Sequence, residues 1–187
     1  MPTHWGLSGE PDQFSAPFPG IFVLSAIMML FALLLPLLPP IDPRKQNYAL
    51  FGNTNQLIQS GILLFLLGLH LVTIVAALRL AINMNRIIVP LVGLLFAGLG
   101  NVMGKIRLNW FVGFRTPWAL NSADVWTRTH RFGARLMVIL GLATMAAGLL
   151  FPAVVRIAVL AVGCCMLAEL TFGYSFSVWR QPGESRG

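Results

Sequence analysis

The residues best suited to chemistry in this sequence lie in one basic and aromatic stretch, Gly104–Gly133. Cations are interspersed there with tryptophan and phenylalanine, and Arg115 directly precedes Thr116–Pro117. This mixture is typical of a membrane interface, where aromatic rings lie at headgroup depth and cations face phosphate. One interpretation is a membrane-anchoring loop. The other is a recognition surface, in which Arg115 beside a rigid dipeptide makes a fixed bidentate contact with an anion.

Two titratable residues, His70 and Glu169, lie inside long apolar runs. A titratable group at membrane depth costs several kcal/mol unless it is paired or hydrated. We expect the two to pair with each other, or Glu169 to meet Arg135 or His130, in a hydrogen bond between helices. The alternative is a proton or ion relay.

The common enzyme motifs are missing from the sequence. It has no H-E-x-x-H zinc motif, no G-x-S-x-G elbow and no phosphate-binding loop. The aspartates at positions 12, 42 and 124 lie outside the apolar runs, which excludes a paired-aspartate intramembrane protease. The histidines at positions 4, 70 and 130 are expected at three different levels. We therefore predict no catalytic site, no cofactor and no metal.

The composition excludes a soluble globular domain. Of the 187 residues, 57% are hydrophobic and 10% are charged, and the net charge is +7. Soluble domains are about 45–50% apolar and about 25% charged. The adjacent pair Cys164 and Cys165 excludes a disulfide scaffold, and both are interpreted as small hydrophobic residues. Basic flanks on membrane helices explain the net charge better than nucleic-acid binding does.

Apolar runs long enough to cross a bilayer core of about 30 Å occur along the whole chain. The sequence therefore predicts an all-α, polytopic transmembrane bundle with five spans. Pro36, Pro39 and Pro40 are expected to end the first span, and Pro152 to mark the turn between the last two. The predicted spans are Ile21–Leu38, Leu57–Leu78, Ile87–Gly104, Leu136–Val155 and Ile157–Trp179.

Between the third and fourth spans, the pattern predicts a separate amphipathic helix lying on the inner surface. Asn121 or Ser122 is suited to cap it. Val125, Thr129 and Phe132 fall on one less polar face. Within the third span, the glycines at positions 93, 98, 100 and 104 are expected to let helices pack closely.

The distribution of lysine and arginine predicts the orientation. Ten lie on one side of the five spans and three on the other, and cytoplasmic loops carry the excess. The N-terminus is therefore expected outside and the C-terminus inside. The single membrane domain then comprises an extracytoplasmic segment (1–19), three helices (20–104), a cytoplasmic loop (105–133), two helices (134–179) and a cytoplasmic tail (180–187). The ten inner residues are Arg44, Lys45, Lys105, Arg107, Arg115, Arg128, Arg131, Arg135, Arg180 and Arg186; the three outer ones are Arg79, Arg86 and Arg156.

Residues 100–133, GNVMGKIRLNWFVGFRTPWALNSADVWTRTHRFG, closely resemble the signature of the SdpI family of bacterial immunity proteins. Residues 2–12, PTHWGxxGxPD, resemble the outer loop of a domain of unknown function that precedes the signature in many members. Residues 41–48, IDPRKxNY, resemble the cytoplasmic turn of that domain. Leu108 and Phe114 depart from the usual proline and isoleucine.

The resemblance implies an integral protein of the bacterial cytoplasmic membrane, without enzymatic activity or cofactor. The founding member protects its producer from a secreted, membrane-active peptide toxin. With toxin bound, it also holds a transcriptional repressor at the membrane. The expected partners are thus membrane lipid, a peptide toxin outside and a repressor protein inside, with no direct contact to nucleic acid.

The residues themselves leave two alternative functions open. One is a small proton-linked transporter using Glu169 and His70, and the other is a membrane enzyme acting on lipid or peptide through the 104–133 stretch.

The resemblance also assigns candidate site residues on both sides of the membrane. On the outer loop they are His4, Trp5 and Asp12. On the cytoplasmic signature loop they are Lys105, Arg107, Asn109, Gly113, Arg115, Thr116, Pro117, Trp118, Ser122, Trp126, Thr129, His130, Arg131 and Gly133. Family members commonly have six helices, with one before the outer loop. We therefore expect in-frame codons upstream of Met1 to encode a further apolar helix.

Overall fold

The computed structural model of the protein describes residues 2–6, 9–14, 16–78, 80 and 82–181. Five helical segments in this part of the chain are long and apolar enough to cross a membrane, which confirms the predicted helical bundle. The elements are β1 (Pro2–Trp5), β2 (Pro11–Phe14), α1 (Pro17–Leu34), η1 (Leu35–Leu37), α2 (Leu38–Ile41), η2 (Lys45–Leu50), α3 (Gly52–Ala77), α4 (Met84–Met103), α5 (Pro117–Asn121), α6 (Ala123–Leu150) and α7 (Ala153–Arg180).

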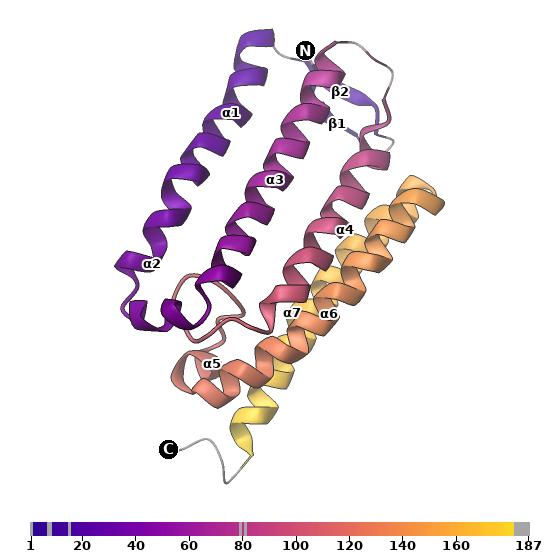
Figure 1. The fold of residues 1–187 in the computed structure, drawn as a ribbon. Helices are drawn as coiled ribbons and strands as arrows, with labels where there is room; N and C mark the ends of the chain where they lie inside the picture. Colours follow the sequence, from indigo (N-terminus) through magenta and orange to yellow (C-terminus); the bar gives the residue numbers. More distant parts are fainter. Residues whose placement is uncertain (1, 7–8, 15, 79, 81, 182–187) are drawn as a thin grey trace.

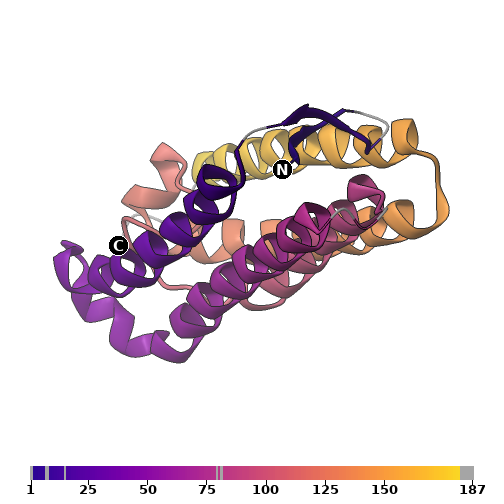
Figure 2. The ribbon, with the colours of Figure 1, turned by 90° about the horizontal axis from the view of Figure 1, so that it is seen from above.

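The helices pack in an order that follows the chain, with α3 between α1 and α4, and α6 between α4 and α7 (Figures 1 and 2). The α4–α6 seam is the closest, because small residues let the two backbones approach. A Cβ atom placed on Gly93 would lie 2.6 Å from the carbonyl oxygen of Gly141, and one on Gly100 would lie 2.8 Å from the Val138 nitrogen. Gly98, in contrast, faces open space, so the expectation of close packing at that position is wrong.

The first span runs past its predicted end at Leu38 and through the three prolines expected to stop it. Its helix passes through the short 3-10 segment η1 and continues as α2 to Ile41. Proline is tolerated because it lies in the first turn of each of these short segments, where the missing N–H has no partner to lose. Pro39 has no N–H for the Leu35 carbonyl, which accepts from the Leu38 N–H of the 3-10 turn and, at 2.8 Å, from the Gln59 side chain of α3.

The predicted amphipathic helix exists, but it is the first part of α6 rather than a separate helix on the membrane surface. Ser122 caps it, with its Oγ accepting from the Val125 N–H at 3.4 Å. Val125 and Thr129 are fully buried, and the Phe132 ring stacks on Tyr174 of α7. Since no proline separates Phe132 from the fourth span, the helix continues through Gly133 to Leu150. At 1.5 Å per residue its length is about 42 Å, more than the hydrocarbon core of about 30 Å.

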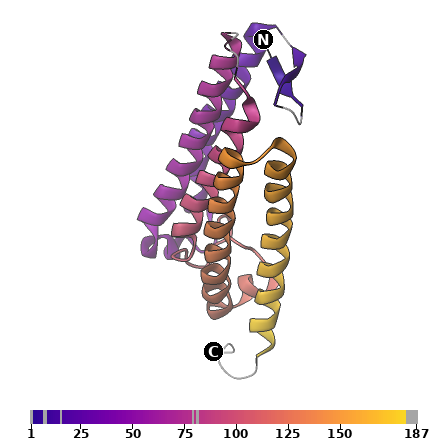
Figure 3. The ribbon, with the colours of Figure 1, turned by 90° about the vertical axis from the view of Figure 1, so that its right-hand side faces the viewer.

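The two ends of the bundle differ in structure (Figures 1 and 3), and the sequence shows that they differ in charge. At one end lie the short loop (residues 42–51), the long loop (residues 104–122, including α5) and the last turn of α7. We call this the basic end, because nine of the ten cations expected inside lie at it or in the adjoining turns of α6; Arg186 and the outer Arg79 fall outside the described residues. At the other end lie the β1–β2 hairpin, the α3–α4 connection and the α6–α7 turn. Gly9 fixes the hairpin to α4 by accepting from the Met84 N–H at 3.2 Å.

The α4–α6 seam yields a stability prediction with a matched control. Gly93→Ala should lower the free energy of unfolding by about 1–3 kcal/mol, because the added methyl overlaps backbone atoms of α6. Gly98→Ala, on the same helix, should leave it unchanged or raise it by up to about 1 kcal/mol. Unfolding in mixed detergent–SDS micelles measures both values. Equal stability of the two variants would contradict the seam.

Candidate functional site

The centre of the basic end is a buried carboxylate, Asp42, at the start of the short loop. It is only 2% exposed. Its Oδ1 accepts from the Arg44 N–H at 2.7 Å, and its Oδ2 accepts from the Tyr48 hydroxyl at 3.1 Å and from the Trp110 N–H at 2.9 Å. Asp42 thus stabilises the short loop through Arg44 and Tyr48. It also holds the long loop, because it accepts from the N–H of Trp110, 68 residues further along the chain.

Asn109, fully buried in the long loop, is the second organising residue. Its Oδ1 accepts from the N–H groups of Phe111 and Val112, and its Nδ2 donates to the carbonyls of Arg107 and Val112. The amide therefore replaces the regular hydrogen bonds that this non-helical backbone lacks. The Tyr48 hydroxyl lies 3.3 Å from Asn109 Oδ1 and joins this turn to Asp42.

Two further contacts join the loops. The Asn47 side chain donates to the Leu108 carbonyl at 2.7 Å, and Arg44 Nη2 donates to the Leu120 carbonyl at 2.9 Å. Burial, followed by the charge of Asp42 and the hydrogen bond to it, raises the pKa of Tyr48 above its ordinary value. Tyr48 therefore remains a neutral hydroxyl donor across the physiological pH range.

His130 of α6 is a buried structural residue that fixes the turn at Gly113. Its Nε2 accepts from the Phe114 N–H at 2.9 Å, and its Nδ1 lies 2.8 Å from the Trp126 carbonyl oxygen. These partners require the neutral tautomer with the proton on Nδ1. Gly113 has φ +121°, and a Cβ atom there would overlap His130 Nε2. Only glycine fits this position.

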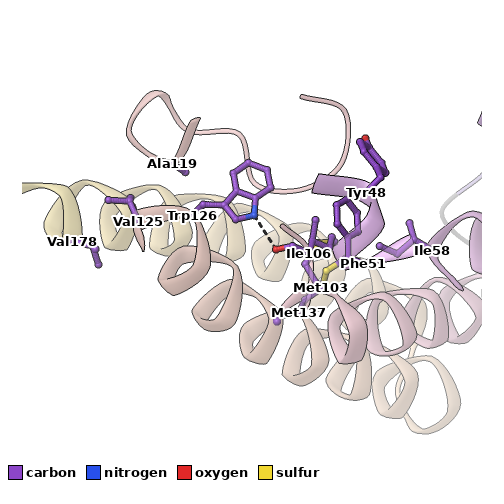
Figure 4. Close-up of a cluster of buried hydrophobic side chains, with 11 residues drawn as sticks. Tyr48, Phe51, Ile58, Met103, Ile106, Ala119, Val125, Trp126, Met137 and Val178 are labelled. Atoms are coloured by element: carbon purple, nitrogen blue, oxygen red, sulfur yellow. Dashed lines mark hydrogen bonds between the residues drawn. The ribbon is translucent and has the colours of Figure 1, made fainter. Parts of the chain in front are cut away.

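Trp126 connects the long loop to the core of the basic end. Figure 4 shows its indole N–H pointing to the Ile106 carbonyl, with the side chains of Tyr48, Phe51 and Met103 nearby. The N···O distance is 3.0 Å, and the indole stacks on His130 with ring centroids 4.0 Å apart. A buried tryptophan needs a partner for its N–H, and the loop carbonyl supplies it.

Helix α5 is attached to α7 by a polar and an aromatic contact. The Thr116 and Ser175 hydroxyl oxygens are 2.5 Å apart and both buried. Thr116 also caps α5, accepting from the Ala119 N–H. The Trp118 ring packs on Phe172, Phe176 and Trp179 of α7, with centroids 4.9–6.2 Å apart.

The candidate residues of the signature loop thus divide into two groups. Asn109, Thr116, Trp126, His130 and Gly133 are buried and hold the loop, as does Gly113 by its conformation; Thr129 is buried, but its hydroxyl has no hydrogen-bond partner in the described part of the chain. The side chains of Lys105, Arg107, Arg115, Pro117 and Arg131 are exposed, and those of Trp118 and Ser122 are partly so. Arg115 Nη1 donates to the Trp110 carbonyl at 2.8 Å, so its position is fixed by the turn that Asp42 and Asn109 hold.

The candidate residues outside the signature loop lie in the β1–β2 hairpin and on helices α3 and α7. In the hairpin at the far end of the bundle, His4 Nδ1 lies 2.5 Å from Asp12 Oδ1, and both side chains are exposed. The expected pairing of His70 with Glu169 is wrong, since His70 Nε2 contacts Ser25 Oγ of α1 at 3.3 Å. Glu169 lies on the exposed surface of α7 and meets neither Arg135 nor His130 in the described part of the chain.

The candidate site residues did not include five members of this network: Asp42, Arg44, Asn47, Tyr48 and Ser175. The first four lie in the IDPRKxNY segment, whose aspartate and tyrosine between two apolar runs were the available signal. For Ser175 the signal was its spacing of four from Thr171, which places two hydroxyl groups on one buried face of α7.

The comparisons with known proteins confirm the family resemblance. Residues 105–175 match the model of the SdpI/YfhL protein family. Residues 1–29 match a domain of unknown function, DUF1648. No curated protein and no solved structure matches the chain. The first match begins in the long loop and ends at Ser175, so it includes most of the buried residues described above.

The Asp42 network predicts a large difference between two aspartate substitutions. Asp42→Asn should lower the free energy of unfolding by about 2 kcal/mol. The NH₂ group of asparagine would face the backbone N–H of Arg44 or Trp110, so a buried hydrogen-bond donor would lose its acceptor. Asp124→Asn removes an exposed pair with Arg128 and a carboxylate in the first turn of α6, and should cost less than about 1 kcal/mol. SDS titration of each variant in micelles measures the two values, and equal losses would contradict the central role of Asp42.

The Tyr48 hydroxyl predicts a dependence of stability on alkaline pH. In the unfolded chain Tyr48 loses its proton near its ordinary pKa of 10.0, whereas in the folded protein that pKa is raised. Its contribution is therefore fully present below pH 10 and is lost as the pH rises further. The free energy of unfolding should fall more steeply above pH 10 in the original protein than in Tyr48→Phe. Parallel curves would exclude this contribution.

Proposed function

Since residues 105–175 carry the SdpI/YfhL family match, we propose that this multi-pass membrane protein is an immunity protein acting against a secreted, membrane-active peptide toxin. The observation that supports a recognition role most directly is the internal support of the long loop. Asp42, Asn109 and His130 are all buried and use their polar atoms to fix loop backbone, so they hold a surface in one shape. The same backbone fixes the exposed Arg115 through its bond to the Trp110 carbonyl, as a recognition surface requires.

The proposed orientation places the basic end in the cytoplasm and the hairpin outside. Nine described cations lie at or near the basic end, and only Arg86 and Arg156 lie toward the other. Arg156 is buried and donates to the Phe151 carbonyl at 2.6 Å, which leaves Arg86 as the exposed cation of that end in the described chain. The excess of cations on one side supports this orientation in the bacterial cytoplasmic membrane.

In this proposal the hairpin meets the toxin first. Its exposed His4 and Asp12 form a polar pair, and the neighbouring Trp5 is half-buried. The hairpin is hydrogen-bonded to the start of α4, the helix with the closest contact to α6. A displacement of the hairpin would therefore be transmitted along α4 to the long loop.

A repressor protein would bind at the basic end. The exposed Lys105, Arg107 and Arg115 lie on the long loop and present positive charge from a fixed backbone. Such a surface suits an acidic patch on a soluble protein partner. Binding there would hold the repressor at the membrane, as the resemblance implies.

A survival assay tests the proposal. The full chain is expressed in toxin-sensitive cells beside Arg115→Ala, His4→Ala and the control Lys45→Ala, which removes an exposed cation of the short loop. We expect the chain and Lys45→Ala to protect, and Arg115→Ala and His4→Ala to reduce survival at least tenfold. Membrane expression of each variant is measured in parallel. Full protection by the Arg115→Ala, His4→Ala double variant would contradict the assigned sites.

A further inference from the structure

Two neighbouring hollows flank α4 and have opposite character. The first lies between α3 and α4, has a volume of about 430 Å³, and is lined almost entirely by apolar side chains and glycine. It includes Leu57, Leu64 and Leu94, which are all exposed at the surface of the bundle. The second lies between α4 and α6, has a volume of about 240 Å³, and is lined by Gly100, Gly104, Arg131, Ala134 and Arg135, among others.

Asn101 of α4 lines both hollows and so joins them. Its side chain is exposed, and its amide has no hydrogen-bond partner in the described part of the chain. Arg131 and Arg135 are exposed and likewise form no ion pair there. Arg128, one turn away, differs from them, because it lies 3.7 Å from Asp124 and donates to Gln181. The second hollow therefore holds two uncompensated positive charges and an amide.

The depth of the two hollows fits one leaflet of a bilayer. Asn101 lies two residues before the end of α4, about 3 Å along the axis, and so at the height of the basic loops. The apolar hollow extends along α4 from Leu91 to Val102, which is about 16 Å of helix. Half of a hydrocarbon core of about 30 Å is about 15 Å. The polar hollow is therefore at headgroup depth, and the apolar one spans the adjoining leaflet.

We infer that the two hollows, joined at Asn101, bind one anionic phospholipid of the leaflet at the basic end. Arg131, Arg135 and Asn101 bind the phosphate, and an acyl chain lies in the hollow between α3 and α4. Guanidinium groups bind phosphate through paired N–H donors, and the amide adds a further donor. Gly61 and Gly98 leave room for the chain: a Cβ on Gly98 would meet nothing within 4 Å, and one on Gly61 only Leu99 at 3.7 Å. The site does not depend on the proposed immunity function.

Lipid binding by the purified full chain tests the site. Native mass spectrometry in a non-ionic detergent compares phosphatidylglycerol with phosphatidylcholine. We expect preferential binding of phosphatidylglycerol, weakened about 25-fold in the Arg131→Gln, Arg135→Gln double variant, since each cation near an anionic headgroup contributes about fivefold. The control Lys45→Gln, Arg180→Gln removes the same charge at the basic end outside the hollow and should bind as the original chain does. Arg131 and Arg135 of the second hollow are both exposed, so the Arg131→Gln, Arg135→Gln variant should fold.

A second variant separates the acyl chain from the headgroup. Gly98→Leu fills the apolar hollow without touching the arginines and should weaken phosphatidylglycerol binding several-fold. Equal binding of the two lipids, or equal losses in the pocket and control double variants, would overturn the proposal. So would displacement of phosphatidylglycerol by inorganic phosphate at millimolar concentration, which would identify a simple anion site. Unchanged lipid binding by Gly98→Leu would overturn the assignment of the apolar hollow.

Discussion

The basic end depends on the need of one buried carboxylate for hydrogen-bond donors. Asp42 ends the first span, and its oxygens take up donors from the short loop and from Trp110 of the long loop. A buried carboxylate without these donors would be far less stable than one in water. Its requirement for donors therefore brings together two segments that are more than sixty residues apart in the chain.

The same principle extends through the rest of the long loop. Non-helical backbone close to a membrane has few waters to satisfy its polar groups, so side chains must do so. Asn109 serves the turn at residues 107–112, His130 serves Phe114, and Trp126 serves the Ile106 carbonyl. Each of these is a buried polar side chain with a backbone partner. The exposed cations of the loop are fixed in space because the backbone beneath them is fixed.

The α4–α6 seam gives these loops a rigid base and also shapes the surface around it. Gly93 and Gly100 face α6 and bring the two helices together, while Gly98 on another face of α4 leaves a hollow. The spacing of these glycines along one helix thus produces both a tight contact and an open groove. Where the groove meets Asn101 and the arginines of α6, apolar and cationic surfaces lie side by side at headgroup depth.

The sequence alone determined the number and position of the spans, because about 20 apolar residues in succession satisfy a bilayer regardless of what they contact. It also identified the signature and narrowed the helix cap to Asn121 or Ser122, since both are local patterns. It did not determine the path of the chain past Pro36 or the continuity of α6, which depend on neighbouring turns. The tertiary structure alone decided the partner of His70, the exposed position of Glu169, the roles of Asp42 and Tyr48, and the two faces of the α4 glycines. Each of them depends on which side chains from distant segments meet, and that is set by packing rather than by spacing along the chain.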